Sequence, residues 1–248
     1  MRISLLFPFW SGGYGVFAHF VKKASIWPPL NLAYLAAEAE REGHQVQIID
    51  GQMEQTAPDE VVRRTSAWDP QIIGITSTTP FHHIAEALAG KLKSALPHIP
   101  IALGGPHVTV LREAGMGKVF DAGFIGEGDL SWPQFLRHMA SGSPLREIPG
   151  VLLRNGATIT GTGEGERIHD LDSLPWPARH LLPMNRYQLG TLQGDKPFAT
   201  LLTMRGCPFQ CIFCSTKVFG RHVRKRAPAA VLEEMSAIVR DFGIRHFV

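Results

Sequence analysis

Short apolar segments alternate with amphipathic segments from residue 1 to about residue 142, and this alternation restricts the fold more than any other feature of the chain. The apolar segments are residues 3–7, 46–50, 72–76, 101–103 and 122–125. Between them, apolar residues recur every three or four positions, as in the stretch 84–96, which is the period of a helix that buries one face. Buried strands that alternate with helices form parallel sheets covered on both faces. The sequence therefore predicts an α/β fold whose first domain, residues 1–142, is a flavodoxin-like, doubly wound parallel sheet.

The loops that follow these strands carry small and hydroxyl side chains. Ligands of doubly wound sheets bind outside the carboxyl ends of the strands, so these loops form the candidate binding site. Its residues are Thr76, Ser77, Thr78 and Thr79 after the third strand, Gly104, Gly105, Pro106 and His107 after the fourth, and Gly126, Glu127 and Gly128 after the fifth. In any one loop these residues could simply make a tight turn or cap a helix. Three such loops at one sheet edge favour ligand binding, because glycine lets a ligand approach the backbone closely.

Two further features belong to this first part of the chain. Gly12-Gly13-Tyr14-Gly15 is expected to form a flexible loop near the same edge, and no GxxxxGK[ST] pattern is present to make it a phosphate-binding loop. Asp129 is expected to cap the helix that follows the fifth strand.

The rest of the chain changes character after residue 142. Residues 143–196 are expected to form an ordered linker, with a hairpin about Asn155-Gly156 and prolines that interrupt regular structure. Residues 197–248 are expected to form a second α/β unit: a strand over 199–203, a helix from Pro228 to Gly243, and a strand over 244–248. One such unit does not close a core by itself, so we expect the chain to stop inside a larger second domain.

The three cysteines, Cys207, Cys211 and Cys214, lie within eight positions of one another directly after the strand predicted over 199–203. A disulfide framework would spread an even number of cysteines along the chain, so clustered thiols indicate metal or cluster ligation in a reducing compartment, the cytoplasm. Iron–sulfur clusters ordinarily use four thiolates. Three thiolates on one loop therefore suit a [4Fe-4S] cluster with one iron left open. A zinc site completed by His222 is the weaker alternative, because structural zinc takes four ligands and this spacing is unusual for it.

Composition and charge exclude other classes of protein. The chain is 44% hydrophobic and 19% charged, which is typical of a globular protein. Its net charge of +3 comes from one basic stretch, composed of Lys217, Arg221, Arg224, Lys225 and Arg226, and a charge this small and local does not predict a nucleic-acid partner. No apolar run is long enough to cross a membrane. The basic stretch is either a solvated surface or a contact to cofactor or substrate.

The cysteine loop resembles the radical SAM superfamily. The resemblance rests on the CxxxCxxC spacing, the preceding strand, the run Met204-Arg205-Gly206 and the aromatic Phe213 before the last cysteine. It implies that the open iron binds the amino and carboxylate groups of S-adenosylmethionine. It also implies that an electron from the cluster cleaves this cofactor to methionine and a 5′-deoxyadenosyl radical. By the same resemblance, Phe213 packs near the adenine.

The first domain is similar to the cobalamin-binding domain of cobalamin-dependent radical SAM proteins. The matching segments, in order, are Pro28-Pro29-Leu30-Asn31-Leu32-Ala33-Tyr34-Leu35-Ala36, Gly43-His44, Asp50-Gly51, Ile75 to Pro80, Leu103 to His107, Gly126-Glu127-Gly128 and Leu174-Pro175-Trp176-Pro177-Ala178-Arg179. Many cobalamin domains carry DxHxxG, whose His binds cobalt, but none of the eleven His residues here has an Asp two positions before it. We therefore expect cobalamin without a lower His ligand, and His107 to make a hydrogen bond at a helix start.

The two resemblances together imply a cobalamin-dependent radical SAM enzyme, or the N-terminal part of one, possessing the first part of a radical SAM partial (β/α) barrel. Such enzymes are typically methyltransferases that act on small molecules and receive electrons from a flavodoxin or ferredoxin. We expect this chain alone to be catalytically incomplete. Two alternatives remain: a radical SAM enzyme whose vestigial first domain binds no cobalamin, and a non-catalytic cobalamin- or cluster-binding protein.

Overall fold

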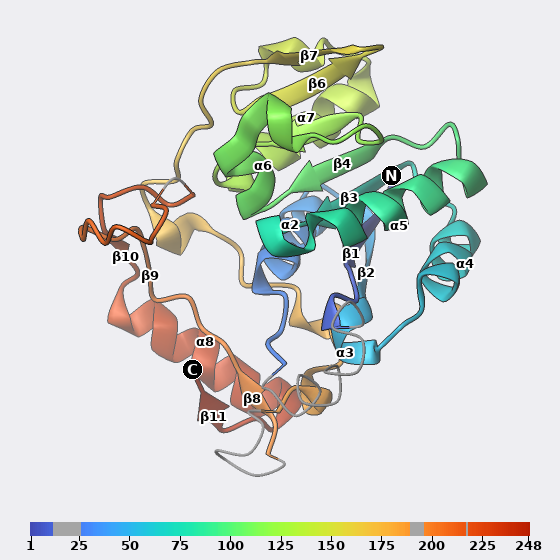
Figure 1. Cartoon of the computed structure of the whole chain (residues 1–248). Coiled ribbons are helices and arrows are strands. Elements are labelled where there is room, and N and C mark those ends of the chain that lie inside the picture. The colour runs from blue at the N-terminus through green and yellow to red at the C-terminus, as the bar shows by residue number, and fades with distance from the viewer. Residues whose placement is uncertain (12–25, 189–195, 217) are drawn as a thin grey trace.

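The main sheet has the strand order of a flavodoxin-like domain. The computed structural model describes residues 1–11, 26–188, 196–216 and 218–248. Its main sheet has the order β2-β1-β3-β4-β5-β6-β7 (Figure 1). The first five strands are parallel: β1 (Arg2–Phe7), β2 (Gln45–Asp50), β3 (Ile72–Thr76), β4 (Ile101–Gly104) and β5 (Ala122–Phe124). The order 2-1-3-4-5 is that of doubly wound flavodoxin-like sheets, which confirms the predicted fold class.

Helices cover both faces of this sheet. The longer ones are α2 (Leu30–Arg41), α4 (Pro58–Trp68), α5 (His82–Ala95) and α7 (Gly128–Ser141), and two short ones are α3 (Gly51–Glu54) and α6 (Pro106–Leu111). Helices α2 and α7 pack on one face, where Ala36 and Phe135 share a core with Ile3 of β1. Helices α4, α5 and α6 pack on the other face, where Leu92 shares a core with Ile73 of β3. Two buried faces explain why the strands are nearly continuously apolar.

The predicted hairpin is present and extends the sheet. Strand β6 (Val151–Asn155) pairs antiparallel with β5, and β7 (Thr158–Gly161) pairs antiparallel with β6. Gly156 at the turn has a φ of +59°, which suits a two-residue hairpin connection. Val151 and Leu152 are fully buried. The first part of the expected linker is therefore part of the sheet, which continues beyond residue 142.

The second part of the expected linker is also packed into the protein, as far as residue 188. Up to there it contains three single turns of 3-10 helix, η5 (Leu171–Ser173), η6 (Arg179–Leu181) and η7 (Met184–Arg186). Leu182, Met184 and Tyr187 are buried in the same core cluster as α2 and α7. The Tyr187 hydroxyl donates a hydrogen bond of 2.7 Å to the Asp50 carboxylate at the end of β2. This segment thus joins the sheet to the C-terminal unit through buried contacts.

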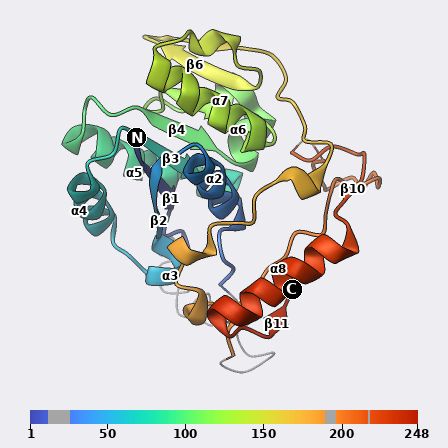
Figure 2. The same ribbon diagram turned by 180° about the vertical axis from the view of Figure 1, so that it is seen from behind.

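The C-terminal unit is a strand–helix–strand arrangement with very short strands. Strand β8 (Phe198–Ala199) pairs parallel with β11 (His246–Phe247), and α8 (Pro228–Phe242) connects them and ends at Gly243 as predicted. The strand expected over 199–203 is thus wrong in extent. Regular strand structure ends at Ala199, although the Leu201 amide still donates a hydrogen bond to the Val248 carbonyl (2.9 Å) and the Thr200 carbonyl accepts one from the Arg179 guanidinium. Strands β9 (Met204–Arg205) and β10 (Arg224–Lys225) form a separate antiparallel pair. Figures 1 and 2 show α8 and β11 at the opposite end of the molecule from the β6–β7 hairpin.

No helix in the part of the chain that the structure describes is long and apolar enough to cross a membrane.

Candidate cofactor site

The three loops that follow β3, β4 and β5 lie against one another, as the topology requires. The Ser77 amide donates a hydrogen bond to the Gly104 carbonyl (3.0 Å), and the His107 amide donates one to the Ser77 carbonyl (3.2 Å). The Gly126 amide donates to the Thr109 hydroxyl (3.0 Å), which ties the third loop to α6. The predicted binding residues are therefore brought together on one edge, here called the carboxyl edge.

The predicted residues of the carboxyl edge differ in how far they are exposed. Thr78, Thr79 and Pro106 are exposed, and Gly104, Gly105, Gly126 and Gly128 are half-buried. Thr76, Ser77, His107 and Glu127 are buried. The Thr76 hydroxyl is already occupied, because it accepts a hydrogen bond from the Asn31 side chain (3.1 Å). A ligand at this edge would contact the exposed hydroxyls and the glycine backbone. The buried residues would pack behind this surface and not touch the ligand.

The two adjacent glycines at the end of β4 have different surroundings. A Cβ added to Gly104 would meet no atom within 4 Å, so this glycine leaves open space at the edge. A Cβ added to Gly105 would lie 2.7 Å from the Ser77 carbonyl oxygen, and Gly105 has a φ of +97°. Gly105 is therefore required by the loop itself, whereas Gly104 is the position where a flat macrocycle could approach the backbone. The open cradle at Gly104 fits the predicted cobalamin.

His107 is held inside the protein. Its Nδ1 lies 3.2 Å from the Thr79 hydroxyl, and its ring stacks on that of His82 with centroids 3.8 Å apart. Burial, and secondarily the neighbouring His82, lower the pKa of His107 below its usual value. The imidazole is thus engaged in packing against His82 and in a hydrogen bond with Thr79.

The cysteine loop connects β9 to β10. Cys207 is half-buried, Cys211 and Cys214 are exposed, and none of the three is in a disulfide. The Cys207 amide donates to the Gly220 carbonyl (3.1 Å), and the Cys214 amide donates to the Cys211 carbonyl (3.1 Å). Phe209, Ile212 and Phe213 are strongly exposed around the thiols, with Phe213 exposing 90% of its surface.

The chemistry of the cysteine loop fits a cluster, although its thiols are not gathered around a point. Within residues 1–11, 26–188, 196–216 and 218–248, no group of three His, Cys, Asp or Glu side chains is close enough to hold a metal ion. His222 is therefore not brought together with the cysteines as a zinc site would require. Because metal binding itself organises short ligand loops, three free thiols on one exposed loop are a suitable donor set for a cluster.

A cavity of about 190 Å³ lies between the carboxyl edge and the cysteine loop. It is lined by Gly126 and Glu127 of the β5–α7 loop, by Glu164 and Arg167, and by Val218 next to the cysteine loop. The two predicted cofactor regions are thus neighbours in the structure. The glycine-rich loop Gly12-Gly13-Tyr14-Gly15 lies outside the described residues.

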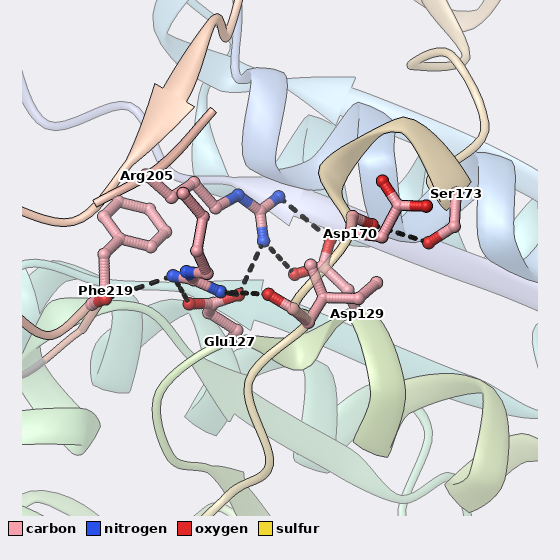
Figure 3. A network of polar contacts seen from close by, with 8 residues as sticks. Glu127, Asp129, Asp170, Ser173, Arg205 and Phe219 are labelled. Carbon is pink, nitrogen blue, oxygen red and sulfur yellow. Dashed lines mark hydrogen bonds and ion pairs between the residues drawn. The ribbon is translucent and has the colours of Figure 1, made fainter. Parts of the chain in front are cut away.

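The expectation that Asp129 caps α7 is wrong. Asp129 lies in the first turn of the helix, where its carboxylate accepts hydrogen bonds from Arg205 (Figure 3). In the basic stretch, Arg224 and Arg226 are not solvated, because their almost fully buried side chains pair with Glu127 and Glu234. A pair of acids two residues apart at a buried strand end, Glu127 and Asp129, is the sequence signal for such burial.

Comparisons with known proteins agree with both regions. The B12 binding domain family model matches residues 20–136. An uncharacterized methyltransferase of Pyrococcus horikoshii is 34% identical over 221 residues, covering 88% of this chain and 47% of the relative. The hopanoid C-3 methylase of Methylococcus capsulatus is 32% identical, covering 85% of this chain and 40% of the relative.

A solved structure shares the fold over the whole chain. It is the radical S-adenosylmethionine methyltransferase TsrM from Kitasatospora setae with cobalamin and a [4Fe-4S] cluster bound, with a TM-score of 0.73 at 16% identity, covering 100% of this chain and 48% of that one. The chain spans about half the length, or less, of the relatives named here. The chain thus contains a B12 binding domain over residues 20–136, and it shares its whole fold with a cobalamin-binding radical S-adenosylmethionine methyltransferase.

Proposed function

We propose that the protein is a cobalamin-dependent radical SAM methyltransferase that acts on a small-molecule substrate. Cobalamin would lie on the carboxyl edge, against Thr78, Thr79 and the backbone at Gly104. Cys207, Cys211 and Cys214 would hold a [4Fe-4S] cluster. When bound, these cofactors supply a transferable methyl group and one-electron cleavage of S-adenosylmethionine.

One observation carries this proposal: three free thiols lie on a loop whose base contacts the carboxyl edge. The Arg205 guanidinium, two residues before Cys207, bonds to Glu127 of the β5–α7 loop at 3.0 Å. A radical SAM methyltransferase requires both cofactors near one substrate, so adjacency of the two regions is the arrangement the function needs. The relatives named as methyltransferases favour methyl transfer as the reaction.

The residues of the two regions take different parts in this function. The exposed Phe213 would pack against the adenine of S-adenosylmethionine, as the family resemblance implies. Because the His107 imidazole is engaged by Thr79 and His82, we expect cobalamin to be bound without this imidazole on cobalt. We infer a flavodoxin or ferredoxin as electron donor and a cytoplasmic location, where free thiols persist.

Spectroscopy of the anaerobically prepared full chain with cob(II)alamin tests this proposal. We expect absorption and electron paramagnetic resonance spectra of the base-off form, without nitrogen superhyperfine splitting from the protein. Splitting from a protein nitrogen would overturn the prediction that cobalamin is bound without a protein His on cobalt. Cluster assembly with no cobalamin binding would overturn the cobalamin part and favour a vestigial first domain.

A further inference from the structure

Four charged side chains meet where the β5–α7 loop contacts strands β9 and β10. They are Glu127, Asp129, Arg205 and Arg224, here called the acid–arginine quartet. Figure 3 labels the first three. Each side chain exposes no more than 6% of its surface. Two acids and two arginines make the quartet electrically neutral, which is the condition under which buried charges are tolerated.

Arg205 lies at the centre of the quartet. Its guanidinium donates to both Asp129 carboxylate oxygens, at 2.5 and 3.1 Å, and to Glu127 Oε2 at 3.0 Å. The rings of Tyr34 and Phe219 lie 5.6 and 5.5 Å from its Cζ, so aromatic faces contact the rest of the cation. Burial alone would lower the pKa of Arg205, but the hydrogen bonds and charges of Asp129 and Glu127 outweigh it and raise the pKa.

Arg224 engages the other side of Glu127. It donates to both Glu127 carboxylate oxygens, one of them at 2.9 Å. It also donates to the carbonyls of Ile168 in the linker and Phe219 after the cysteine loop. Both oxygens of Glu127 are therefore occupied by arginines. The Glu127 side chain, predicted from the sequence as a cobalamin contact, is directed at the cysteine loop instead.

The two arginines form the base of the cysteine loop. Arg205 and Arg224 are directly opposite each other in the antiparallel β9–β10 pair. Like charges at opposed positions of a strand pair repel and weaken the pairing. Glu127 lies between the two guanidinium groups and offsets that repulsion. The short β9–β10 pair thus depends on an acid supplied by a loop 78 positions earlier in the chain than Arg205.

We propose that Glu127 and Asp129 are positioning residues that fix the base of the cysteine loop against the carboxyl edge. The β5–α7 loop then serves two purposes: its backbone forms part of the carboxyl edge, and its carboxylates hold the loop predicted to bind the cluster. The link between this positioning and cluster binding rests on the proposed function. The structural part of the inference concerns only residues of this chain and is measurable without cofactors.

Hydrogen–deuterium exchange of the cofactor-free full chain tests the anchoring directly. Glu127→Gln should speed exchange of the Cys207 and Arg226 amides, which bond to the Gly220 and Thr203 carbonyls, by about tenfold or more, because local opening becomes easier. Amides of β3 and β4 should keep their exchange rates. Glu60→Gln is the matched control, since Glu60 also accepts two hydrogen bonds from one arginine, Arg63, but at an exposed site; it should leave all these rates unchanged.

Cofactor loading of the same variants separates positioning from ligand contact. Glu127→Gln and the milder Asp129→Asn should release iron to a chelator about fivefold faster or more after reconstitution, because the loop opens more readily, with cobalamin affinity unchanged. Asp129→Asn keeps the test decisive if Glu127→Gln fails to fold.

Unchanged exchange at Cys207 and Arg226 in a folded variant would overturn the proposal, as would a tenfold loss of cobalamin affinity without a change in exchange. Failure of the wild-type chain to bind either cofactor would contradict the proposed function and leave the exchange result standing.

Discussion

At the scale of single residues, two neighbouring glycines show how the structure refines a sequence-based prediction. Both Gly104 and Gly105 follow β4 in a loop predicted to bind cobalamin, and the sequence does not distinguish them. The structure does, because a Cβ on Gly105 would collide with the Ser77 carbonyl and one on Gly104 would project into open space. Gly105 is thus required by the loop conformation, whereas Gly104 leaves open space at the edge.

Gly104→Val should weaken cobalamin binding by tenfold or more, about 1.4 kcal/mol, because its side chain fills the space left for the macrocycle. Its thermal unfolding should match that of the wild type. Gly105→Val should lower the unfolding temperature by itself, since valine disfavours a φ of +97° and meets the Ser77 backbone. Equal cobalamin affinity in Gly104→Val and wild type would show that the ligand does not lie there.

Asp50 is a second residue with a measurable consequence. Burial raises its pKa to about 6, although hydrogen bonds from Met53, Tyr187 and Gln52 oppose the shift. An acid whose pKa is raised by folding destabilises the folded state most above that pKa, and the penalty falls as the pH drops from about 6 toward 4. Tyr187→Phe removes one hydrogen bond to the ionised carboxylate, so it should destabilise the chain by about 1–3 kcal/mol at pH 8.

The loss in Tyr187→Phe should be smaller at pH 5, where Asp50 is largely protonated. Denaturant unfolding of both proteins at pH 5 and pH 8 gives this difference directly. A loss independent of pH would mean that the hydroxyl contributes only through packing.

At the scale of elements, helices and strands set by neighbouring residues were predictable from the sequence, whereas the pairing of distant segments was not. The five parallel strands, α2, α5 and the end of α8 at Gly243 follow from periodicity and from turn residues, which are properties of neighbouring positions. The hairpin itself was predictable from Asn155-Gly156, but its pairing with β5 was not, because strand partners are not encoded locally. The strand expected over 199–203 is shorter: beyond Ala199, the Thr200 carbonyl bonds to Arg179 of the linker and the Thr203 carbonyl to the Arg226 amide.

A buried ion pair connects α8 to the linker run Leu174-Pro175-Trp176-Pro177-Ala178-Arg179. Arg179 pairs with Glu234 of α8 at 2.6 Å, and Arg226 pairs with the same carboxylate. The Glu234 side chain exposes only 1% of its surface. One buried acid therefore holds the linker, the end of the basic stretch and α8 together.

Glu234→Ala should destabilise the chain by about 3–5 kcal/mol, because it leaves the buried Arg179 without its acid and Arg226 with only the longer contact to Asp172. Glu233→Ala is the control on the same helix, where the side chain is exposed and the cost should be within about 0.5 kcal/mol. Denaturant unfolding measures both. Equal effects of the two substitutions would mean that the buried ion pairs contribute little to stability.

At the scale of the whole molecule, the two cofactor regions belong to one connected structure. A single core cluster runs from β1 and α2 through Met184 and Tyr187 to Phe198 and Ile238. The acid–arginine quartet joins the carboxyl edge to the cysteine loop beside it. The sequence identified both regions, since each is a local motif. It did not reveal their connection, because the partners of Glu127 lie 78 and 97 positions away.

The central claim is that this chain provides a thiolate site for a cluster and a separate edge for cobalamin. Anaerobic reconstitution followed by metal and cobalamin analysis tests it most directly. We predict about four irons per chain, as in a [4Fe-4S] cluster, and their loss with retained cobalamin in each of Cys207→Ala, Cys211→Ala and Cys214→Ala. A tightly held zinc in the anaerobically purified chain, with no iron taken up on reconstitution, would contradict the claim.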